Sequence, residues 1–165
     1  MRQNPVKITF HVTNSVFKGF LKDVIPSGYR RGEDGHYYKV PGEEKNWDDA
    51  QRTCSSDGAN LPIISDDLTR GVVLRLMPAG GWIGAFDQRQ EGVWKTPNMD
   101  NLLYAKWAKG EPNNKGNADC AFQGSDGLWN DFSCKDSRPF ICQILSGENL
   151  KCLTNLSYML SDILW

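Results

Sequence analysis

Hydrophobic and polar positions change their spacing several times along the chain, and each spacing predicts a different element. In residues 6–12 they alternate, which predicts a short strand whose apolar face is made of Val6, Ile8, Phe10 and Val12. Residues 15–25 carry apolar side chains at helical spacing and predict an amphipathic helix. Pro26-Ser27-Gly28 ends that helix, so residues 1–28 are expected to form an N-terminal appendage.

A main domain is expected over residues 29–145, and it begins with a strand and a helix. Residues 37–40 form the predicted strand. Asn46 is a suitable N-cap, because its side-chain oxygen can accept a hydrogen bond from the first turn of a helix. The spacing i, i+3, i+7 then predicts an inner helix face made of Trp47, Ala50 and Cys54.

A second helix is predicted to begin at Ser65. Asp66 and Asp67 would lie in its first turn, where negative charge is favourable. The residues expected to face inward are Leu68, Val72 and Leu76. Gly80-Gly81 is expected to end this helix.

The second half of the domain predicts short strands separated by long polar loops. These strands begin with Trp82-Ile83-Gly84 and end with Phe140-Ile141-Cys142. Loops of this length in a compact domain are usually functional or stabilised by an ion. Residues 146–165 form a Leu-rich tail that carries a glycosylation sequon, Asn155-Leu156-Ser157, and the fifth cysteine, Cys152.

Composition excludes several classes of function. The chain has 165 residues, 39% of them hydrophobic, which is enough for one domain with a core. Its net charge is −1 and its Lys and Arg residues do not cluster, so a nucleic-acid-binding face is not expected. No apolar stretch is long enough to cross a bilayer, so membrane insertion is not expected. The tryptophans beside the polar motifs are expected to fill the core beneath the loops.

Five cysteines in a loop-rich domain indicate an oxidising compartment, with scattered buried thiols as the alternative. A cysteine metal cluster is not expected, because no two cysteines have CxxC spacing and only two histidines are present. Residues 1–30 contain no visible secretion signal. We therefore expect an extracellular protein whose sequence is a fragment, an incomplete gene model or one domain of a longer chain.

Two short segments carry the candidate chemistry. Glu111-Pro112-Asn113 and Trp129-Asn130-Asp131 each place a carboxylate and a side-chain amide within three residues. Such oxygen donors suit Ca²⁺, and a carboxylate beside an amide offers both partners that a sugar hydroxyl needs. Each segment alone would be an ordinary turn. The two histidines have no nucleophile beside them in the sequence, so an enzyme is not expected.

Five motifs in order resemble the C-type lectin domain family over roughly residues 29–143. The stretch from Trp47 to Cys54 is similar to the family's first helix, and Trp82-Ile83-Gly84 to its central strand. Tyr104-Ala105-Lys106-Trp107 precedes the long loop, and Asp131, Cys134 and Cys142 follow one another at the family's spacing.

The resemblance implies an α+β fold with two helices, short antiparallel sheets and a long calcium-binding loop. It also implies two disulfides, one between Cys54 and Cys142 and one between Cys120 and Cys134. The residues alone indicate only that the second pair would pin the segment it flanks, and that the first would tie the ends of the domain together. The extra cystine of the family's long form is absent, since His36 stands where a cysteine is expected.

The principal site implied by the resemblance binds one Ca²⁺ and a sugar together. Its ligands would be Glu111, Asn113, Asn130 and Asp131, with the Asp131 carbonyl assisting. Two vicinal sugar hydroxyls would coordinate the ion. Each hydroxyl would also donate a hydrogen bond to one of these carboxylates and accept one from an asparagine amide. In the family, the order Glu-Pro-Asn goes with mannose-, N-acetylglucosamine- and fucose-type glycans and Gln-Pro-Asp with galactose. Pro112 would be cis.

The chain departs from the family pattern at both calcium sites. Ala118 stands where the principal site usually has a second Glu, and the loop is one residue short, so Asp119 is a candidate replacement. An auxiliary site would use Asp87, Glu91 and Asp119, but Asn114 replaces its usual Asp. A protein-interaction module, in which calcium only stiffens the loop, is the alternative function. Cys152, left without a partner by these pairings, is predicted to form an interchain disulfide or to remain a buried thiol.

Overall fold

The computed structural model describes residues 25–146. The strand predicted at 6–12 and the tail after Ser146 lie outside the described residues, as does the helix predicted at 15–25 apart from Ile25.

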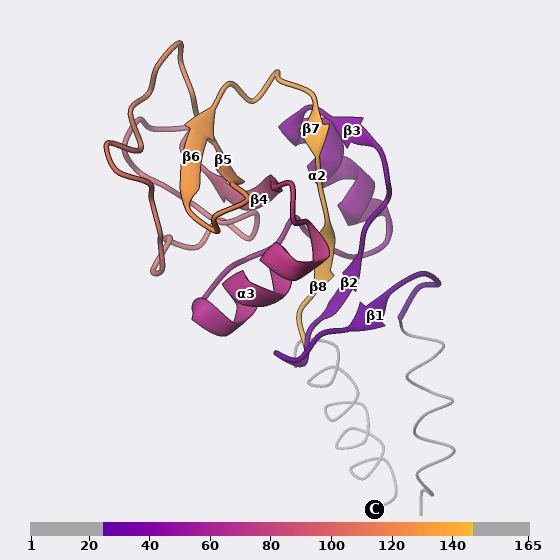
Figure 1. The fold of residues 1–165 in the computed structure, drawn as a ribbon. Helices are drawn as coiled ribbons and strands as arrows, with labels where there is room; N and C mark the ends of the chain where they lie inside the picture. Colours follow the sequence, from indigo (N-terminus) through magenta and orange to yellow (C-terminus); the bar gives the residue numbers. More distant parts are fainter. Residues whose placement is uncertain (1–24, 147–165) are drawn as a thin grey trace, which may run out of the picture.

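Three small antiparallel sheets and two helices make up the domain, which confirms the expected α+β fold (Figure 1). In the first sheet β2 lies between the two other strands, in the order β1 (Arg30–Arg31), β2 (Tyr37–Lys39) and β8 (Cys142–Ile144). The second sheet pairs β3 (Glu44–Lys45) with β7 (Arg138–Pro139). The third contains β4 (Gly81–Phe86), β5 (Cys120–Gln123) and β6 (Trp129–Phe132).

Helix α2 (Trp47–Ser56) forms as the sequence predicts. The Asn46 side chain accepts a hydrogen bond from the backbone N–H of Asp49 and so caps the first turn. Its buried residues are the predicted Trp47, Ala50 and Cys54. The Trp47 indole also donates a hydrogen bond to the Ile83 carbonyl, 2.9 Å away, which fixes the helix against β4.

Helix α3 (Asp67–Leu76) corrects part of the prediction. Asp66 is the N-cap, because its carboxylate accepts from the Thr69 N–H at 2.7 Å, and the helix ends before Met77 rather than at Gly80-Gly81. Of the residues expected to face inward, only Val72 is buried, whereas Leu68 is 52% exposed and Leu76 41% exposed. The buried face consists of Thr69, Val72 and Val73. The helix is therefore rotated toward the side on which Thr69 and Val73 lie.

Tryptophans fill the core beneath the loops, as expected. Trp47, Trp82 and Trp129 are all at most 4% exposed, and Trp129 packs edge-on against the partly buried Trp107. A side chain cannot replace hydrogen at Gly80, where a Cβ would lie 2.6 Å from the Gln123 carbonyl oxygen and φ is +89°. This close approach lets the turn after α3 lead directly into β4.

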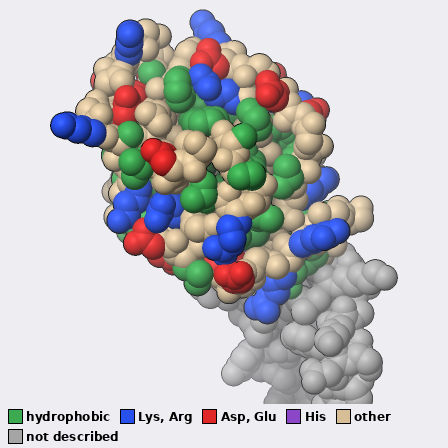
Figure 2. Space-filling view, viewed as in Figure 1, with side chains coloured by type: hydrophobic (Ala, Val, Ile, Leu, Met, Phe, Trp, Pro, Cys, Tyr) green, Lys and Arg blue, Asp and Glu red, His purple; other side chains and the backbone are tan. Residues whose placement is uncertain are grey.

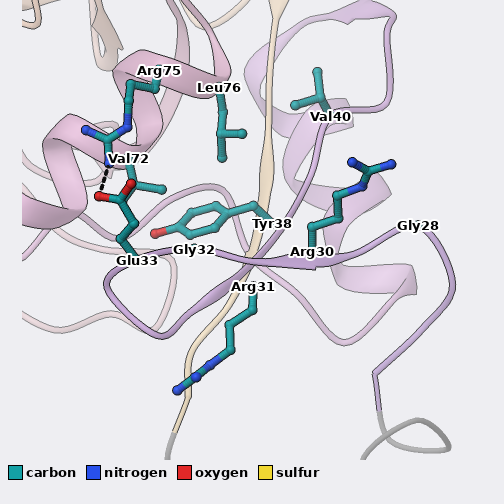
Figure 3. Close-up of a pocket in the computed structure, with 10 residues that line it drawn as sticks. All are labelled: Gly28, Arg30, Arg31, Gly32, Glu33, Tyr38, Val40, Val72, Arg75 and Leu76. Carbon is teal, nitrogen blue, oxygen red and sulfur yellow. Dashed lines mark hydrogen bonds and ion pairs between the residues drawn. The ribbon is translucent and has the colours of Figure 1, made fainter.

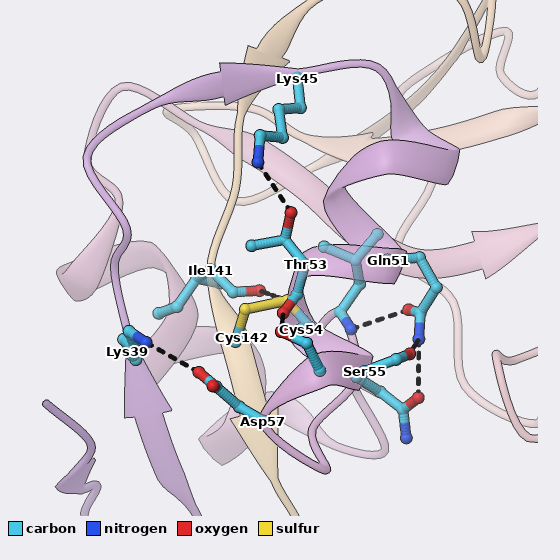
Figure 4. Close-up of a disulfide and its surroundings, with 12 residues drawn as sticks. Lys39, Lys45, Gln51, Thr53, Cys54, Ser55, Asp57, Ile141 and Cys142 are labelled. Carbon is cyan, nitrogen blue, oxygen red and sulfur yellow. Dashed lines mark hydrogen bonds and ion pairs between the residues drawn. A yellow bond between two sulfur atoms is a disulfide. The ribbon is translucent and has the colours of Figure 1, made fainter. Parts of the chain in front are cut away.

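Both implied disulfides are present. Cys54 of α2 bonds to Cys142 of β8 across a sequence separation of 88 residues, and Figure 4 shows this cystine beneath the end of the helix. Cys120 at the start of β5 bonds to Cys134 just after β6. The first bond ties the two halves of the chain together, and the second closes the hairpin that carries Asp131.

Candidate calcium and sugar site

The predicted ligands lie at one end of the domain, between the long loop after β4 and strand β6. Residues 87–119 form this loop, in rose to salmon tones in Figure 1, and they lie far from the sheet where β1 and β8 flank β2. The Glu111–Pro112 peptide bond is cis, as the resemblance implies. Glu111 and Asn113, on either side of Pro112, both contact Asp131 of β6.

Asp131 is the residue on which the loop converges. Its carboxylate accepts the backbone N–H of Asn113 at 3.0 Å to each oxygen and the N–H of Asn114 at 2.6 Å. The Asn113 amide donates in turn to Glu111 Oε1 at 2.7 Å. Three of the four predicted principal ligands, Glu111, Asn113 and Asp131, are thus in one hydrogen-bonded group.

The two carboxyl groups of this group interact directly. Contact with the Asp131 carboxyl, together with burial, raises the pKa of Glu111. Burial acts to raise the pKa of Asp131 as well, but its hydrogen bonds with Glu111 and with the backbone N–H groups outweigh burial and lower it. Glu111 Oε2 is buried and has no hydrogen-bond partner. An oxygen without a partner, beside a second carboxylate, fits a calcium ion better than it fits an uncharged protein group.

Asn130 is less firmly placed in the site. It follows Trp129 in β6 and pairs with Phe122, whereas Asp131 pairs with Ala121, so the two side chains leave opposite faces of the strand. Within residues 25–146, no side-chain hydrogen bond joins Asn130 to Glu111, Asn113 or Asp131. The structure therefore brings together three of the predicted ligands. The fourth, Asn130, is next to Asp131 in the chain but is not part of their hydrogen-bonded group.

A second acidic cluster lies next to the principal group. Ligand oxygens of Asp87, Glu91 and Asp119 are within 4.8 Å of one another, as the auxiliary site requires. Asp87 is 2% exposed, and burial is the main reason that its pKa is raised, with the charges of Glu91, Asp119 and Asp131 adding to the effect. One of its oxygens, Oδ1, is buried without a hydrogen-bond partner. These residues also fit a calcium ion, since a cation would relieve their repulsion.

The structure places the residues that depart from the family pattern. Asp119 lies with Asp87 and Glu91, and its Oδ2 accepts from the Asn117 amide. Ala118 is buried, at 3% exposure, and offers no ligand. Asn114 Oδ1 accepts a hydrogen bond from the Ala118 N–H at 2.9 Å. Three of the four predicted auxiliary residues thus lie together, whereas the side chain of the fourth, Asn114, is hydrogen-bonded to the backbone.

The backbone N–H groups of Asn113 and Asn114 are part of the site that the sequence did not reveal. They hold the Asp131 carboxylate in place, although neither was predicted to do so. Sequence signals for this contact were weak, because every residue except proline has an N–H group. The run of asparagines, which adopt positive φ more readily than most residues, was the available signal.

Other grooves lie away from this site. One of about 400 Å³ opens between β1, β2 and α3, where Tyr38, Val40 and Leu76 line it beside three arginines (Figure 3). On the face shown in Figure 2, side chains of both charges are interspersed and no single basic patch forms. No helix within the described residues is long and apolar enough to cross a membrane.

Comparison with known proteins agrees with this geometry. Residues 43–144 match the family described as "Lectin C-type domain". The chain belongs to the C-type lectin domain family. It is 32% identical over 120 residues to human "C-type lectin domain family 17, member A", covering 72% of this chain and 32% of that protein. It is also 32% identical over 134 residues to bovine "Pulmonary surfactant-associated protein D", covering 78% of this chain and 36% of that protein. The chain thus spans about a third of these two relatives.

Solved C-type lectin domains have the same fold. The carbohydrate-recognition domain of the mouse scavenger receptor C-type lectin is 28% identical, with a TM-score of 0.67, and the match covers 72% of this chain and 96% of that one. The cow domain of CD23, solved in the presence of a GlcNAc2Man3 oligosaccharide, is 25% identical with a TM-score of 0.68, covering 73% of this chain and 95% of that one. The C-type lectin fold of this domain follows from its own elements and from these neighbours.

Proposed function

We propose that this C-type lectin domain is a calcium-dependent carbohydrate-binding domain that recognises mannose-, N-acetylglucosamine- or fucose-type glycans. The observation that carries the proposal is the convergence of Glu111, Asn113 and Asp131, with a buried Glu111 oxygen that has no partner. The CD23 domain among the neighbours was solved with a mannose-containing oligosaccharide, which supports the same class of ligand. The domain binds its ligand and does not transform it.

Each proposed ligand has a distinct role. A bound Ca²⁺ would supply coordination positions for two vicinal sugar hydroxyls. Glu111 and Asp131 provide the negative charge that balances the ion, and they can accept hydrogen bonds from the sugar hydroxyls. The Asn113 and Asn130 amides can donate hydrogen bonds to the hydroxyl oxygens. The Asn113 amide already donates to Glu111, so the pair is oriented before a ligand arrives. The order Glu111-Pro112-Asn113 favours equatorial 3- and 4-hydroxyls, and hence mannose over galactose.

Retention on immobilised mannose tests the proposal. In calcium, the wild-type domain should be retained, and EDTA or free mannose should elute it while galactose does not. Asp131→Asn keeps the shape of the side chain but removes its charge, and it should abolish retention. Retention that persists in EDTA would contradict the calcium mechanism, and equal elution by galactose would contradict the specificity. Single-site affinity should be weak, so a column with dense ligand is the suitable support.

We also propose that Asp87, Glu91 and Asp119 form an auxiliary calcium site that supports the loop. Their convergence and the partnerless Asp87 oxygen favour this role. The alternative function, a protein-interaction module, is favoured by Ala118, which leaves the principal site without the family's second Glu. A protein ligand bound equally well in calcium and in EDTA, together with no retention on mannose, would support the alternative.

The family relatives and the two disulfides support an extracellular location for this domain, with the proposed boundaries 29–145. Cys152 lies outside the described residues and is proposed to form an interchain disulfide in a homodimer. Non-reducing electrophoresis should then show a dimer that Cys152→Ser abolishes. A monomer with one titratable thiol would contradict the dimer.

A further inference from the structure

The groove between α3 and the first sheet has an apolar surface that the described residues leave open. Val72 and Leu76 line its α3 side and Tyr38 its β2 side, as Figure 3 shows. Val40, just after β2, is 48% exposed, and Leu76 is 41% exposed. Both residues also line a second groove of about 300 Å³, so the apolar surface continues from one groove into the other. An apolar surface with charged residues at its edge is typical of a contact with another segment or protein.

The orientation of α3 produces this surface. The spacing of apolar residues predicts that Leu76 faces inward, but the helix buries Thr69 and Val73 instead. Leu76 therefore lines the groove without being buried in it. Water remains in contact with this side chain unless a further segment covers it, and covering it would be favourable.

Positive charge predominates around the groove. Arg30, Arg31 and Arg75 line it together with one acidic residue, Glu33, which is paired with Arg75 at 2.8 Å. Within residues 25–146, neither Arg30 nor Arg31 has an ion-pair partner. The groove therefore favours an apolar segment that carries an excess of acidic residues.

The sequence after Ser146 has both properties. Residues 147–165 contain two acidic residues, Glu148 and Asp162, and one basic residue, Lys151. An isolated helix of this length is only marginally stable in water, so its apolar side needs a surface to pack against. Helical spacing predicts that this side is a stripe made of Leu153, Leu156, Leu160 and Ile163.

The described chain ends beside the groove. The Ser146 N–H donates to Nδ1 of His36 at 3.0 Å, and His36 lies in the turn between β1 and β2. Gly32 and Glu33, in the same turn, line the groove. As a helix, residues 147–165 would extend about 28 Å, which is longer than the ten-residue helix α3 that borders the groove.

The segment before Ile25 suits the groove less well. Residues 1–24 carry four basic residues and one acidic residue, so they would meet the arginines with like charge. Ile25 itself packs against the core cluster that contains Trp47 of α2, whereas Tyr38 and Val72 belong to the other cluster. Both charge and position therefore favour the C-terminal segment.

We propose that residues 147–165 dock as an amphipathic helix in the groove between α3 and the first sheet, with their leucine stripe on Val40, Val72 and Leu76. The acidic residues of the segment reduce the excess positive charge around the groove. Docking keeps the segment beside the first sheet, far from the loop that carries the proposed sugar site, and it does not depend on the proposed function.

Docking is a local step that is separate from unfolding of the domain. The contact is small compared with the core, so the segment should leave the groove at a lower urea concentration than the one at which the domain unfolds. Substitutions in the groove should therefore change docking and leave the cooperative unfolding transition in place.

Trypsin cleavage after Lys151 reports docking, because Lys151 is the only basic residue in the segment. The full chain is used with Cys152→Ser, so that an interchain disulfide cannot restrain the segment. Mass spectrometry follows the release of residues 152–165. A synthetic peptide of residues 147–165 with the same substitution gives the cleavage rate of the undocked segment.

Cleavage in the full chain should be at least about tenfold slower than in the peptide, because a docked helix must open before trypsin can bind it. Leu76→Ser and Val40→Ser should each accelerate cleavage about fivefold, since each removes an apolar side chain from the contact. Leu68→Ser is the matched control and should stay within about twofold. Leu68 is on the same helix and is 52% exposed, but it lines neither groove.

Cleavage of the full chain as fast as the peptide would overturn the proposal. An equal acceleration by Leu68→Ser would also overturn it, as would unchanged cleavage in both Leu76→Ser and Val40→Ser. Protection that is lost on dilution would show that the segment of a second copy fills the groove, which contradicts docking within one chain. The assay needs neither calcium nor sugar, so failure of the proposed function would leave this test valid.

Discussion

At the scale of single residues, Asp119 shows how the acidic side chains at the loop are distributed between the two proposed calcium sites. Asp119 was a candidate for the principal site, because Ala118 has no carboxylate. The structure brings the Asp119 carboxylate to within 4.8 Å of Asp87 and Glu91 instead. The structure brings together the acidic residues that the sequence predicts for each group, and their role as ligands stays a prediction. Spacing alone was unable to assign Asp119, since it lies next to Ala118, the position of the family's second Glu.

Asp119→Asn separates these roles. Removing one charge from the auxiliary cluster should raise the calcium needed for half-maximal mannose binding by about tenfold without abolishing binding. The melting temperature in EDTA should not fall, because three mutually repelling carboxylates become two. Calcium titrations on a mannose surface provide the measurement. Complete loss of binding, as expected for Asp131→Asn, would mean that Asp119 serves the principal site.

At the scale of elements, the helices show what periodicity resolves and what it leaves open. Helix α2 was predicted correctly, because Trp47, Ala50 and Cys54 are its only apolar residues and lie on one face. Helix α3 contains apolar residues all round, so several inner faces fit its sequence equally well. The packing of Val72 and Val73 against β4 and β5 residues selects one face, and that choice depends on tertiary contacts absent from the local pattern.

Substitutions in α3 should reproduce this asymmetry. Val72→Ala deletes buried methyl groups and should lower the free energy of unfolding by about 2 kcal/mol. Leu76→Ser, which the sequence pattern alone would rank as equally harmful, should change it by less than about 0.5 kcal/mol, since Leu76 is 41% exposed. Urea denaturation of both variants makes the comparison. A larger loss for Leu76→Ser would contradict the orientation of the helix.

The cap of the same helix should make stability depend on pH. The Thr69 N–H bond to Asp66 is the main reason that the pKa of Asp66 is lowered. The ionised carboxylate therefore stabilises the folded state fully above the ordinary aspartate pKa, near 4, and this contribution is lost as pH falls through the lowered folded pKa. Asp66→Ala should cost about 1 kcal/mol at pH 7 and less at pH 3.

Urea denaturation at the two pH values tests this dependence. Asp66→Asn is the matched control, because its amide oxygen still accepts the Thr69 N–H but does not titrate. An Asp66→Ala domain as stable as the wild type at pH 7 would show that the cap contributes nothing.

At the scale of the whole molecule, the two disulfides are expected to contribute differently to stability and to calcium binding. The Cys54–Cys142 bond closes a loop of 88 residues and the Cys120–Cys134 bond one of 14. In the chain-entropy model these lengths correspond to about 4.5 and about 3 kcal/mol of stabilisation. The short bond, however, closes the hairpin that positions Asp131.

Replacing each pair by alanine should therefore separate stability from binding. Cys54→Ala with Cys142→Ala should lower the unfolding free energy more, whereas Cys120→Ala with Cys134→Ala should raise the calcium requirement more. Urea denaturation and calcium titration on the two double variants give both quantities. Equal effects on calcium would show that the hairpin keeps its geometry without the bond.

The long cystine also determines how the domain responds to mechanical tension. Strands β1 and β8 flank β2 in one sheet, and the cystine joins α2 to β8 close by. Force applied between the two ends of the domain therefore passes through the sulfur bridge and bypasses the segment from 54 to 142, which contains both acidic groups. About 300 Å of extended chain would stay locked while the bridge is intact. A domain pulled at its ends would thus keep its loop folded until a reductant opened the bridge.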